Sequence, residues 1–471
     1  MKIANKFFKR IAVVFLSVLM LVTATACAGG DNGIKITFMV EGSVYQTVTL
    51  AEDGAFTLPE DPTKTDMSFL GWYLDDGVWE NKLTTETQVA ENLTVYARFG
   101  NLLNLTYYVH NNLYYEGKMD GSSTVQLPAE PQIDGFRFDG WYFLSVSNGQ
   151  MTNTKLTADY FVNNNTQQSK KVGAKMTQIT KDNSSTGTYR ISGNYLYMGV
   201  YPTAYYSGTP SLKSQTPVAS GKYKGYYEGT NGKYYAKVDS AVVNAKRTPL
   251  FFQDESTVIQ ADKTYYFVVE EIKWRIIEKD TDTALVMPTQ IMFRHKFQDA
   301  TNANSNNGID VRDYKASDIR AYMNGELINQ IFTAEERAVI LTSWVDNSKD
   351  QVGWKNSKLP CPWEDTYDKL FLMSQKDFNG YFGGAIDYSA FALKVSDYQR
   401  ATGMRVLTTE LNGGDNGYSN WWLRSRSNEL DSPVALGCAA PGAGGKGHIP
   451  SAACNVYEDE YGVVPVFRVD L

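Results

Sequence analysis

The feature that most constrains the fold of this 471-residue chain is an internal repeat near its beginning. Residues 36–73 align with residues 105–142 at a constant offset of 69, without a gap. Two motifs recur in register, Leu-Pro-x-x-Pro at 58–62 and 127–131 and Phe-x-Gly-Trp-Tyr at 69–73 and 138–142. Each copy must therefore build its own small core. Because units of this size bury little surface, we expect Trp72 and Trp141 to supply much of that core.

Each copy also opens with a hairpin pattern. Residues 36–40 alternate between apolar and polar up to a Glu41-Gly42 turn, and residues 105–109 lead to an Asn111-Asn112 turn. Such turn residues between alternating segments are typical of two antiparallel strands. We therefore expect both copies to begin with a β-hairpin.

The ordered set of an opening strand, the two motifs and a closing Leu-Thr-Val-Tyr-Ala strand at 93–97 resembles the internalin-type B repeat, or Listeria–Bacteroides repeat. The resemblance implies small β-grasp-like modules, often in tandem on bacterial surface proteins. We place the first repeat at 34–100 and a degenerate second repeat, which lacks a clear closing strand, at 101–162. The polar segment 163–188 is predicted to be a linker.

Residues 189–471 are predicted to form one larger α+β domain, so the fold class is multidomain and β-rich. Strand patterns occur at 195–199 and 264–269, and a hairpin is expected around Lys279-Asp280. Helical spacing from Ile319 to Leu327 is followed by a Thr-x-x-Glu capping box at 333–336.

Four short motifs in this domain resemble an uncharacterised family of Gram-positive surface proteins: Gly-x-Tyr-Pro at 199–202, Ile-x-Trp-Arg at 272–275, Ser-Asp-Ile-Arg at 317–320 and Trp-Trp-Leu-Arg-Ser at 421–425. Members end in Gly-Val-Arg-Pro. Here Val464 replaces that arginine, so its role does not carry over. The layout is also similar to C-type-lectin-like domains of the formylglycine-generating-enzyme type. Those enzymes bind copper with closely spaced cysteines, whereas Cys438 and Cys454 stand 16 apart.

The start of the chain reads as a secretory signal. Residues 1–26 combine four basic residues with an apolar stretch shorter than a membrane span. Ala24-Thr25-Ala26 before Cys27 resembles a lipobox, although Ala24 stands where leucine is usual. This predicts lipidation of Cys27, followed by a spacer at 27–33. The alternative is an ordinary signal peptide cut at the same place, with Cys27 incidental.

Charge limits the partners of the exported chain. The whole sequence has 45 basic and 52 acidic residues; removing the four basic residues of the signal leaves 41 against 52, a net charge of −11. Such a balance argues against nucleic acid and against an anionic membrane surface as binding partners. The expected partners are the membrane, through the lipid anchor, and a surface protein or glycan.

Trp421, Trp422 and Arg424 are the candidate ligand-binding residues. On a strand, adjacent tryptophans send one ring to each face, so one ring could be core and the other could stack on a sugar or a partner. The alternative is that both rings are buried and Arg424 pairs internally.

Other candidate sites carry weaker patterns. Asn412, Asp415 and Asn416 offer oxygen ligands for calcium on a Gly-rich turn, which is also readable as a plain turn cluster. Cys438 and Cys454 could form a disulfide in an exported protein. No familiar catalytic or phosphate-binding motif occurs, so we expect no catalytic residue and no cofactor.

We therefore expect a non-enzymatic surface lipoprotein of the binding or adhesion type, with two repeats as a spacer for a lectin-like domain. Three alternatives stay open. A carbohydrate- or cell-wall-binding component would have an exposed aromatic platform flanked by Asn or Asp. An envelope enzyme would have a concave site where His448, Cys438 or paired carboxylates converge. A purely structural stalk would have no pocket.

Overall fold

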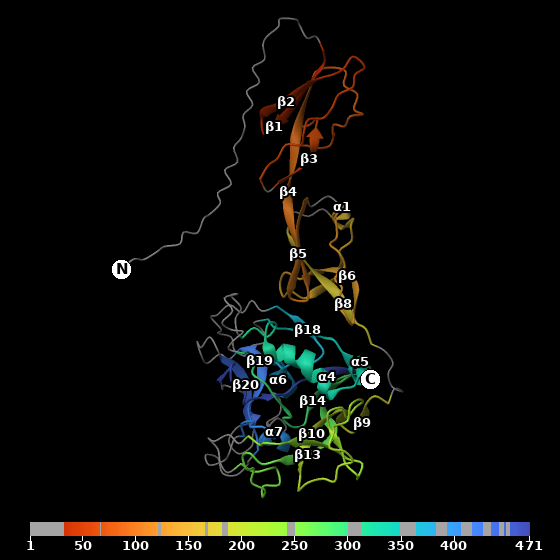
Figure 1. Ribbon diagram of the computed structural model, residues 1–471. Coiled ribbons are helices and arrows are strands. Elements are labelled where there is room, and N and C mark those ends of the chain that lie inside the picture. The colour runs from red at the N-terminus through yellow and green to blue at the C-terminus, as the bar shows by residue number, and fades with distance from the viewer. Residues whose placement is uncertain are drawn as a thin grey trace, which may run out of the picture. The chain divides into compact units, whose positions relative to one another are not determined.

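The computed structural model describes residues 33–65, 67–120, 124–164, 168–180, 187–242, 250–299, 312–348, 364–382, 393–406, 417–426, 435–441, 447–448 and 453–471. Contacts divide the chain into two compact units. The first contains the first repeat, and the second contains the second repeat together with the C-terminal domain (Figure 1).

The first repeat is a small twisted sheet. Its strands are β1 (Lys35–Val40), β2 (Ser43–Thr49), β3 (Met67–Tyr73) and the first part of β4 (Leu93–Val109). β1 pairs antiparallel with β2 and parallel with β4, and β3 pairs antiparallel with β4. The predicted hairpin and closing strand are both confirmed. Glu41 forms the turn with a positive φ of 49°.

Trp72 is the centre of the first repeat's core. The indole is 2% exposed and meets the rings of Phe38 and Phe69 edge-on, at centroid distances of 4.9 and 5.2 Å. Gly71, directly before it, lies at a bulge with a φ of 127°, and the side chain of Lys82 covers its Cα. The motif therefore joins a residue that tolerates this backbone to the ring that fills the core.

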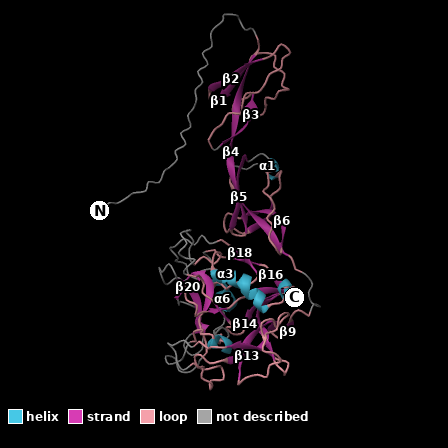
Figure 2. Ribbon diagram, in the orientation of Figure 1, coloured by secondary structure: helices cyan, strands magenta, loops and turns pink. Residues whose placement is uncertain are grey.

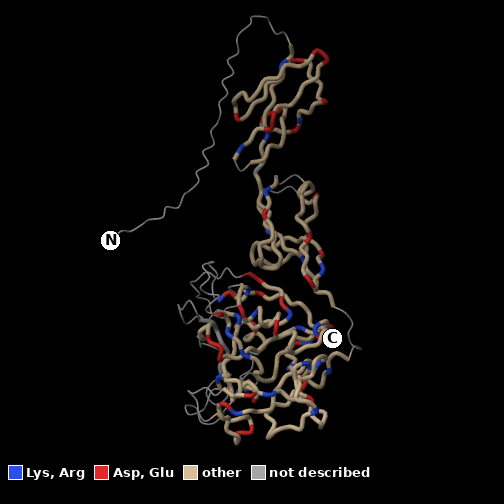
Figure 3. Tube along the Cα trace, in the orientation of Figure 1, with Lys and Arg blue, Asp and Glu red and all other residues tan. Residues whose placement is uncertain are grey.

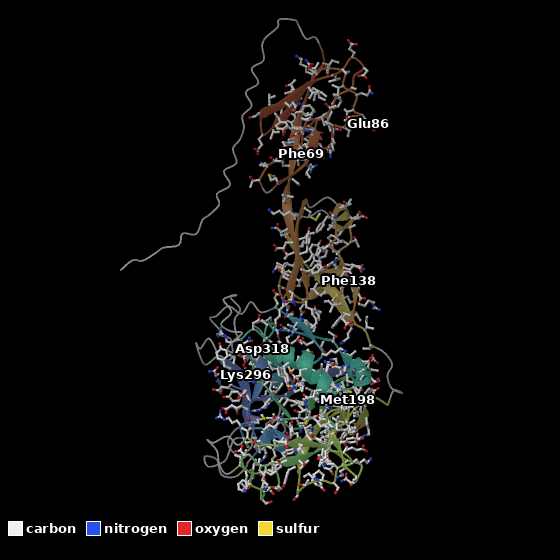
Figure 4. All side chains as sticks on the ribbon, viewed as in Figure 1. Phe69, Glu86, Phe138, Met198, Lys296 and Asp318 are labelled. Atoms are coloured by element: carbon white, nitrogen blue, oxygen red, sulfur yellow. The ribbon has the colours of Figure 1, made fainter. Side chains whose placement is uncertain are left out.

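The second repeat repeats this geometry. Its elements are the rest of β4, β5 (Asn112–Asp120), β6 (Phe136–Leu144), β7 (Met151–Lys155), α1 (Tyr160–Asn163) and β8 (Lys170–Gln178). Trp141 meets Tyr107 and Phe138 at 5.1 and 5.3 Å. Phe69 and Phe138, both labelled in Figure 4, thus play equivalent parts.

The closing strand of the second repeat is β8, which corrects the boundary expected at residue 162. β8 pairs parallel with β4 and antiparallel with β6, just as the first part of β4 pairs parallel with β1 and antiparallel with β3 in the first repeat. Its Lys170 faces Leu105, whereas Leu93 faces Ile36, so the closing strand is offset by 77 rather than 69. The second repeat has eight extra residues before its closing strand. The strand therefore lies beyond the end of the ungapped alignment, in the segment predicted to be a linker.

The C-terminal domain is built on a main sheet with the central order β12-β13-β14-β24-β16. Its strands are β9 (Arg190–Ser192), β10 (Tyr195–Tyr206), β11 (Tyr227–Glu228), β12 (Tyr234–Val238), β13 (Tyr265–Lys279), β14 (Thr283–Pro288), β16 (Ile340–Leu341) and β24 (Phe467–Asp470). All six residues of β14 are buried. Ala284 and Val286 enter one core cluster, and Leu285 and Met287 enter another. The sheet is therefore covered on both faces.

Short helices and smaller strands complete this domain (Figure 2). The helices are α3 (Asp318–Tyr322), the π-helical η1 (Met323–Leu327), α4 (Ile328–Ile331), α5 (Ala334–Ala338), α6 (Gln375–Phe382) and α7 (Asp397–Ala401). The expected capping box is confirmed, since the Thr333 side chain accepts from the Glu336 N–H and the Glu336 side chain accepts from the Thr333 N–H.

A second sheet carries the Trp-Trp-Leu-Arg-Ser segment. It contains β15 (Phe293–Arg294), β19 (Trp421–Arg426), β20 (Ala435–Pro441), β21 (Gly447–His448), β22 (Ala453–Asn455) and β23 (Gly462–Val463); β17 (Ser343–Val345) and β18 (Thr366–Asp368) form a separate pair. Figure 3 shows charges of both signs interspersed along the trace of this domain.

Candidate functional site

The tip of the second repeat's hairpin contacts the C-terminal domain. The His110 ring lies on the indole of Trp344, with centroids 4.3 Å and planes 11° apart. Its Nδ1 is 2.6 Å from the hydroxyl of Tyr367. Burial lowers the pKa of His110 to about 4, although Asp346 acts to raise it. The imidazole is therefore neutral at pH 7, and the residue is half-buried.

Two asparagines extend the contact. The Asn111 N–H donates to the carboxylate of Asp365, and the Asn112 side chain both donates to the Asp365 carbonyl and accepts from the Asp365 N–H. Trp344 Nε1 donates to the same carboxylate at 2.8 Å. Burial raises the pKa of Asp365 even though these donors lower it. The tip and the β17–β18 pair are thus joined by directional hydrogen bonds.

The first repeat lacks this docking chemistry at the equivalent turn. Glu41 has the same left-handed backbone as His110, with φ values of 49° and 53°, but its carboxylate pairs with Lys64 of its own repeat. The residues that follow are Gly42 and Ser43 in place of the two asparagines. The two hairpin tips therefore have the same backbone conformation and differ in the side chains that a partner would contact.

A cavity of about 510 Å³ opens beside this contact. The second repeat and five strands or helices of the C-terminal domain line it, through His110, Phe136, Gln178, Leu285, Ser343, Trp344, Val345, Asp346, Phe371, Met373, Lys376, Asp377, Tyr381, Arg424, Val466 and Arg468. Its volume lies within the ~300–1,000 Å³ of small-ligand sites. Because His110, Phe136 and Gln178 come from the second repeat, the cavity is incomplete without the docked repeat.

Arg424 forms the buried polar wall of the cavity. Its side chain is 4% exposed and donates to the Leu372 carbonyl at 2.6 Å and to Asp377 at 2.5 Å. Burial alone would raise the pKa of Asp377, but Arg424 and hydrogen bonds from Ser374 outweigh it and the pKa is lowered. The pair is therefore ionised and internally neutral.

Two buried polar atoms on this wall have no hydrogen-bond partner among the described residues. They are the Oγ of Ser343, a residue that is 8% exposed, and the Nε of Arg424. Leaving such a group unsatisfied costs about 1–3 kcal/mol, so native proteins rarely do so. Both atoms lie on residues that line the cavity. Both atoms are buried within the wall, so an occupant of the cavity does not reach them.

Two aromatic residues of the lining are partly exposed. Trp344 on β17 and Tyr381 on α6 are each 38% exposed. The Tyr381 hydroxyl donates to Glu278 at 2.8 Å, which fixes the direction of the ring. The cavity therefore combines aromatic surface with polar groups, a composition that suits recognition of a small polar ligand.

The lining also contains the residue types of a hydrolase triad, Ser343, His110 and Asp346. A serine nucleophile needs a hydrogen bond to its histidine base. Here Ser343 Oγ has no partner among the described residues, and the Nδ1 of His110 faces Tyr367. A histidine whose pKa is about 4 is also a weak base at neutral pH. The geometry does not assemble this triad.

The structure corrects the reading of Trp421 and Trp422 as ligand-binding residues. They are 1% and 0% exposed, and they enter opposite core clusters, as strand alternation predicts. Trp422 Nε1 donates to the His295 carbonyl. Both are core residues, and of the three candidates only Arg424 lines the cavity.

The other predicted sites fall largely outside the described residues. Cys27 and the calcium candidates Asn412, Asp415 and Asn416 lie there, as do the side chains of Cys438 and Cys454. The backbone register of β20 and β22 places Cys454 opposite Leu436. Within the described ranges, no cluster of three metal-ligating side chains occurs, and no helix is long and apolar enough to cross a membrane.

Sequence reasoning missed Ser343, Trp344, Lys376 and Tyr381. The one available signal was the difference between the two hairpin tips, because His-Asn-Asn replaces Glu-Gly-Ser at aligned positions. That difference marks the second tip as specialised. It does not identify the partner strand, which lies more than 200 residues away in the sequence.

Comparisons with known proteins agree with the modular architecture. Residues 35–98 and 104–168 match the Listeria-Bacteroides repeat domain, and residues 281–470 match a domain of unknown function (DUF6273). Internalin H of Listeria monocytogenes is 32% identical over 107 residues, 22% of this chain and 19% of that protein. A putative membrane protein of Evansella cellulosilytica is 30% identical over 114 residues, 24% of this chain and 17% of its own. The chain thus spans about a fifth of the length of these relatives. It carries two Listeria-Bacteroides repeats ahead of a domain whose family has no assigned function.

Proposed function

We propose that this chain is a cell-surface lipoprotein that binds a ligand without transforming it. The observation that carries the binding role is the cavity of about 510 Å³ between the second repeat and the C-terminal domain, with the partly exposed rings of Trp344 and Tyr381 in its lining. The surface location is supported by the two repeats and by their similarity to Internalin H and to a putative membrane protein.

The lipid anchor rests on the sequence alone. Small residues precede Cys27 after a basic and apolar leader, the arrangement that predicts lipidation. Two acyl chains on the exported cysteine would hold the chain at the outer face of the membrane, because each buried methylene contributes about 0.8 kcal/mol. Partners are then a surface protein or a glycan, and nucleic acid stays excluded by the acidic balance.

The two repeats have different roles in this proposal. The second repeat donates three side chains to the cavity and is part of the binding module. The first repeat, with the residues that precede it, serves as the spacer. The sequence led us to expect that both repeats are spacers, and the proposal keeps that role for the first repeat alone.

We also propose that the C-terminal domain is C-type-lectin-like. Short helices α3 to α5 precede the Trp/Arg strand β19, and β24 closes the domain by pairing with β14. An experimental structure of this domain, superposed on lectin-like domains, tests that assignment.

Two measurements test the function. Palmitate labelling of cells that express the native protein or Cys27→Ala tests the anchor, and labelling of the native protein only is expected. The soluble Cys27→Ala chain is then applied to glycan and protein arrays, with and without Asn112→Ala to weaken docking. The proposal expects binding on one array that Asn112→Ala reduces; binding on neither array contradicts it.

A further inference from the structure

The junction cavity has the size of a small-molecule site rather than of a protein interface. The cavity is concave and has a volume of about 510 Å³. Its lining comes from two folded parts of one compact unit. Protein partners bury broad, nearly flat surfaces, whereas small ligands are enclosed. The occupant is therefore expected to be a compact molecule or one or two units at the end of a chain.

Charge balance in the lining favours a neutral occupant. Of its three cations, Arg424 already contacts Asp377, and Arg468 contacts Glu278 at 2.9 Å. Lys376 is the cation of the lining for which the described residues offer no ion pair. Asp377 is neutralised by Arg424, and Asp346 adds a carboxylate to the same cavity. An anion would gain the Lys376 cation but face the Asp346 carboxylate, whereas a neutral molecule with hydroxyl groups can donate to the acid and accept from the base.

The accessible groups of the lining fit a ring that carries hydroxyl groups. The ammonium of Lys376, an exposed residue of the lining, donates hydrogen bonds. The partly exposed rings of Trp344 and Tyr381 supply flat apolar surface in the same cavity. A sugar ring presents this combination, with hydroxyl groups around its rim and C–H groups on its faces, so it suits aromatic and polar surfaces together.

We propose that this cavity binds a short neutral saccharide. Lys376 Nζ would contact its hydroxyl groups, and Trp344 and Tyr381 would pack against its C–H faces. The inference rests on the proposed binding function and names the ligand class of that site. Since His110 and Gln178 complete the lining, binding requires the docked second repeat.

The test uses the intact soluble Cys27→Ala chain. A glycan array that carries neutral and uronate-containing saccharides is followed by calorimetric titration with the strongest neutral saccharide, glucuronate and inorganic phosphate. The neutral saccharide is expected to bind and the two anions to bind more weakly. Tyr381→Ala should weaken binding roughly five- to tenfold, while Tyr381→Phe, which keeps the ring, should change it less than about twofold.

Matched controls separate binding from stability. Chemical denaturation of each variant shows whether a loss of binding is a loss of folding. Lys376→Gln should weaken binding, and Lys224→Gln, at an exposed site outside the lining, should not.

Three results would overturn the inference. Tighter binding of glucuronate or phosphate would exclude a neutral ligand. Saccharide binding that Lys376→Gln and Tyr381→Ala leave intact would place the site elsewhere. Binding to the protein array alone would remove the saccharide but keep the proposed binding function, whereas binding to neither array would remove both.

Discussion

The imidazole of His110 lies flat on the indole of Trp344, 4.3 Å away, and so joins a repeat module to the domain that follows it. The equivalent residue of the first repeat, Glu41, keeps the same left-handed backbone and pairs within its own module. One turn geometry thus serves two purposes. The difference lies in side chains that are suited either to solvent or to a neighbouring surface.

Asn112 is expected to stabilise docking through the two hydrogen bonds it makes with the backbone of Asp365. Asn112→Ala should lower the free energy of unfolding by about 1–3 kcal/mol, since it also leaves the buried Asp365 N–H without its acceptor. Ser43→Ala at the equivalent position of the first repeat is the control and should stay within about 0.5 kcal/mol. Chemical denaturation of the intact chain measures both. Equal effects of the two substitutions would argue against docking.

Docking should weaken in mild acid. The pKa of His110 is about 4 when docked, against an ordinary value of 6.5, so the undocked state binds the proton more tightly. The contribution of His110 to the stability of the docked state is complete above pH 6.5 and is lost as the pH falls from 6.5 toward 4. The loss is on the order of 2 kcal/mol after allowing for partial exposure of the ring. The raised pKa of Asp365 acts in the opposite direction, because its protonation favours the docked state.

The variant His110→Asn isolates this effect, because asparagine accepts the left-handed backbone of residue 110. Unfolding midpoints of the native chain and the variant are compared between pH 8 and pH 5. The native chain should lose more stability than the variant over this range. Parallel curves would show that His110 does not titrate in this way.

Breaking the buried Arg424–Asp377 pair should be costly. Arg424→Gln leaves the Asp377 carboxylate without its cation and should destabilise the domain by about 3–5 kcal/mol. The exposed Arg137–Asp139 pair gives the contrast, and Arg137→Gln should cost less than about 1 kcal/mol. Thermal unfolding of the two variants tests the difference. A small effect at Arg424 would mean that the pair is well solvated.

The motif glycines should resist substitution in both repeats. Gly71 and Gly140 have φ values of 127° and 135°, and an added Cβ would meet the side chains of Lys82 and Lys155. Each alanine variant should destabilise its repeat by more than about 1 kcal/mol. Gly325 has open space around it and lies in the helical segment η1, so Gly325→Ala should instead be neutral or stabilise by up to about 1 kcal/mol. Denaturation midpoints decide the sign in each case.

The sequence allowed the local parts of this fold to be predicted, because each motif acts on its near neighbours. Gly71 and Trp72 shape one strand, and Thr333 and Glu336 cap one helix. The alternation that sends Trp421 and Trp422 to opposite faces also follows from strand geometry alone. Such patterns hold whatever the rest of the chain does.

The docking site could not be predicted in the same way. His110 and Tyr367 are 257 residues apart, and nothing in either segment specifies the other. The aromatic residues that attracted attention, Trp421 and Trp422, are adjacent in the sequence but serve the core. Trp344 and Tyr381 lie on separate short elements and meet only at the cavity. The insertion that displaced β8 likewise hid the true end of the second repeat.

The central claim is that the second repeat and the C-terminal domain act as one module. A double-mutant cycle of His110→Asn and Trp344→Ala tests it most directly, with stability measured for both single variants and the double variant. A coupling energy of about 0.5–1.5 kcal/mol is predicted for the stacked pair. Additive effects, with no coupling beyond about 0.3 kcal/mol, would show that the rings do not meet in solution and would contradict the shared cavity.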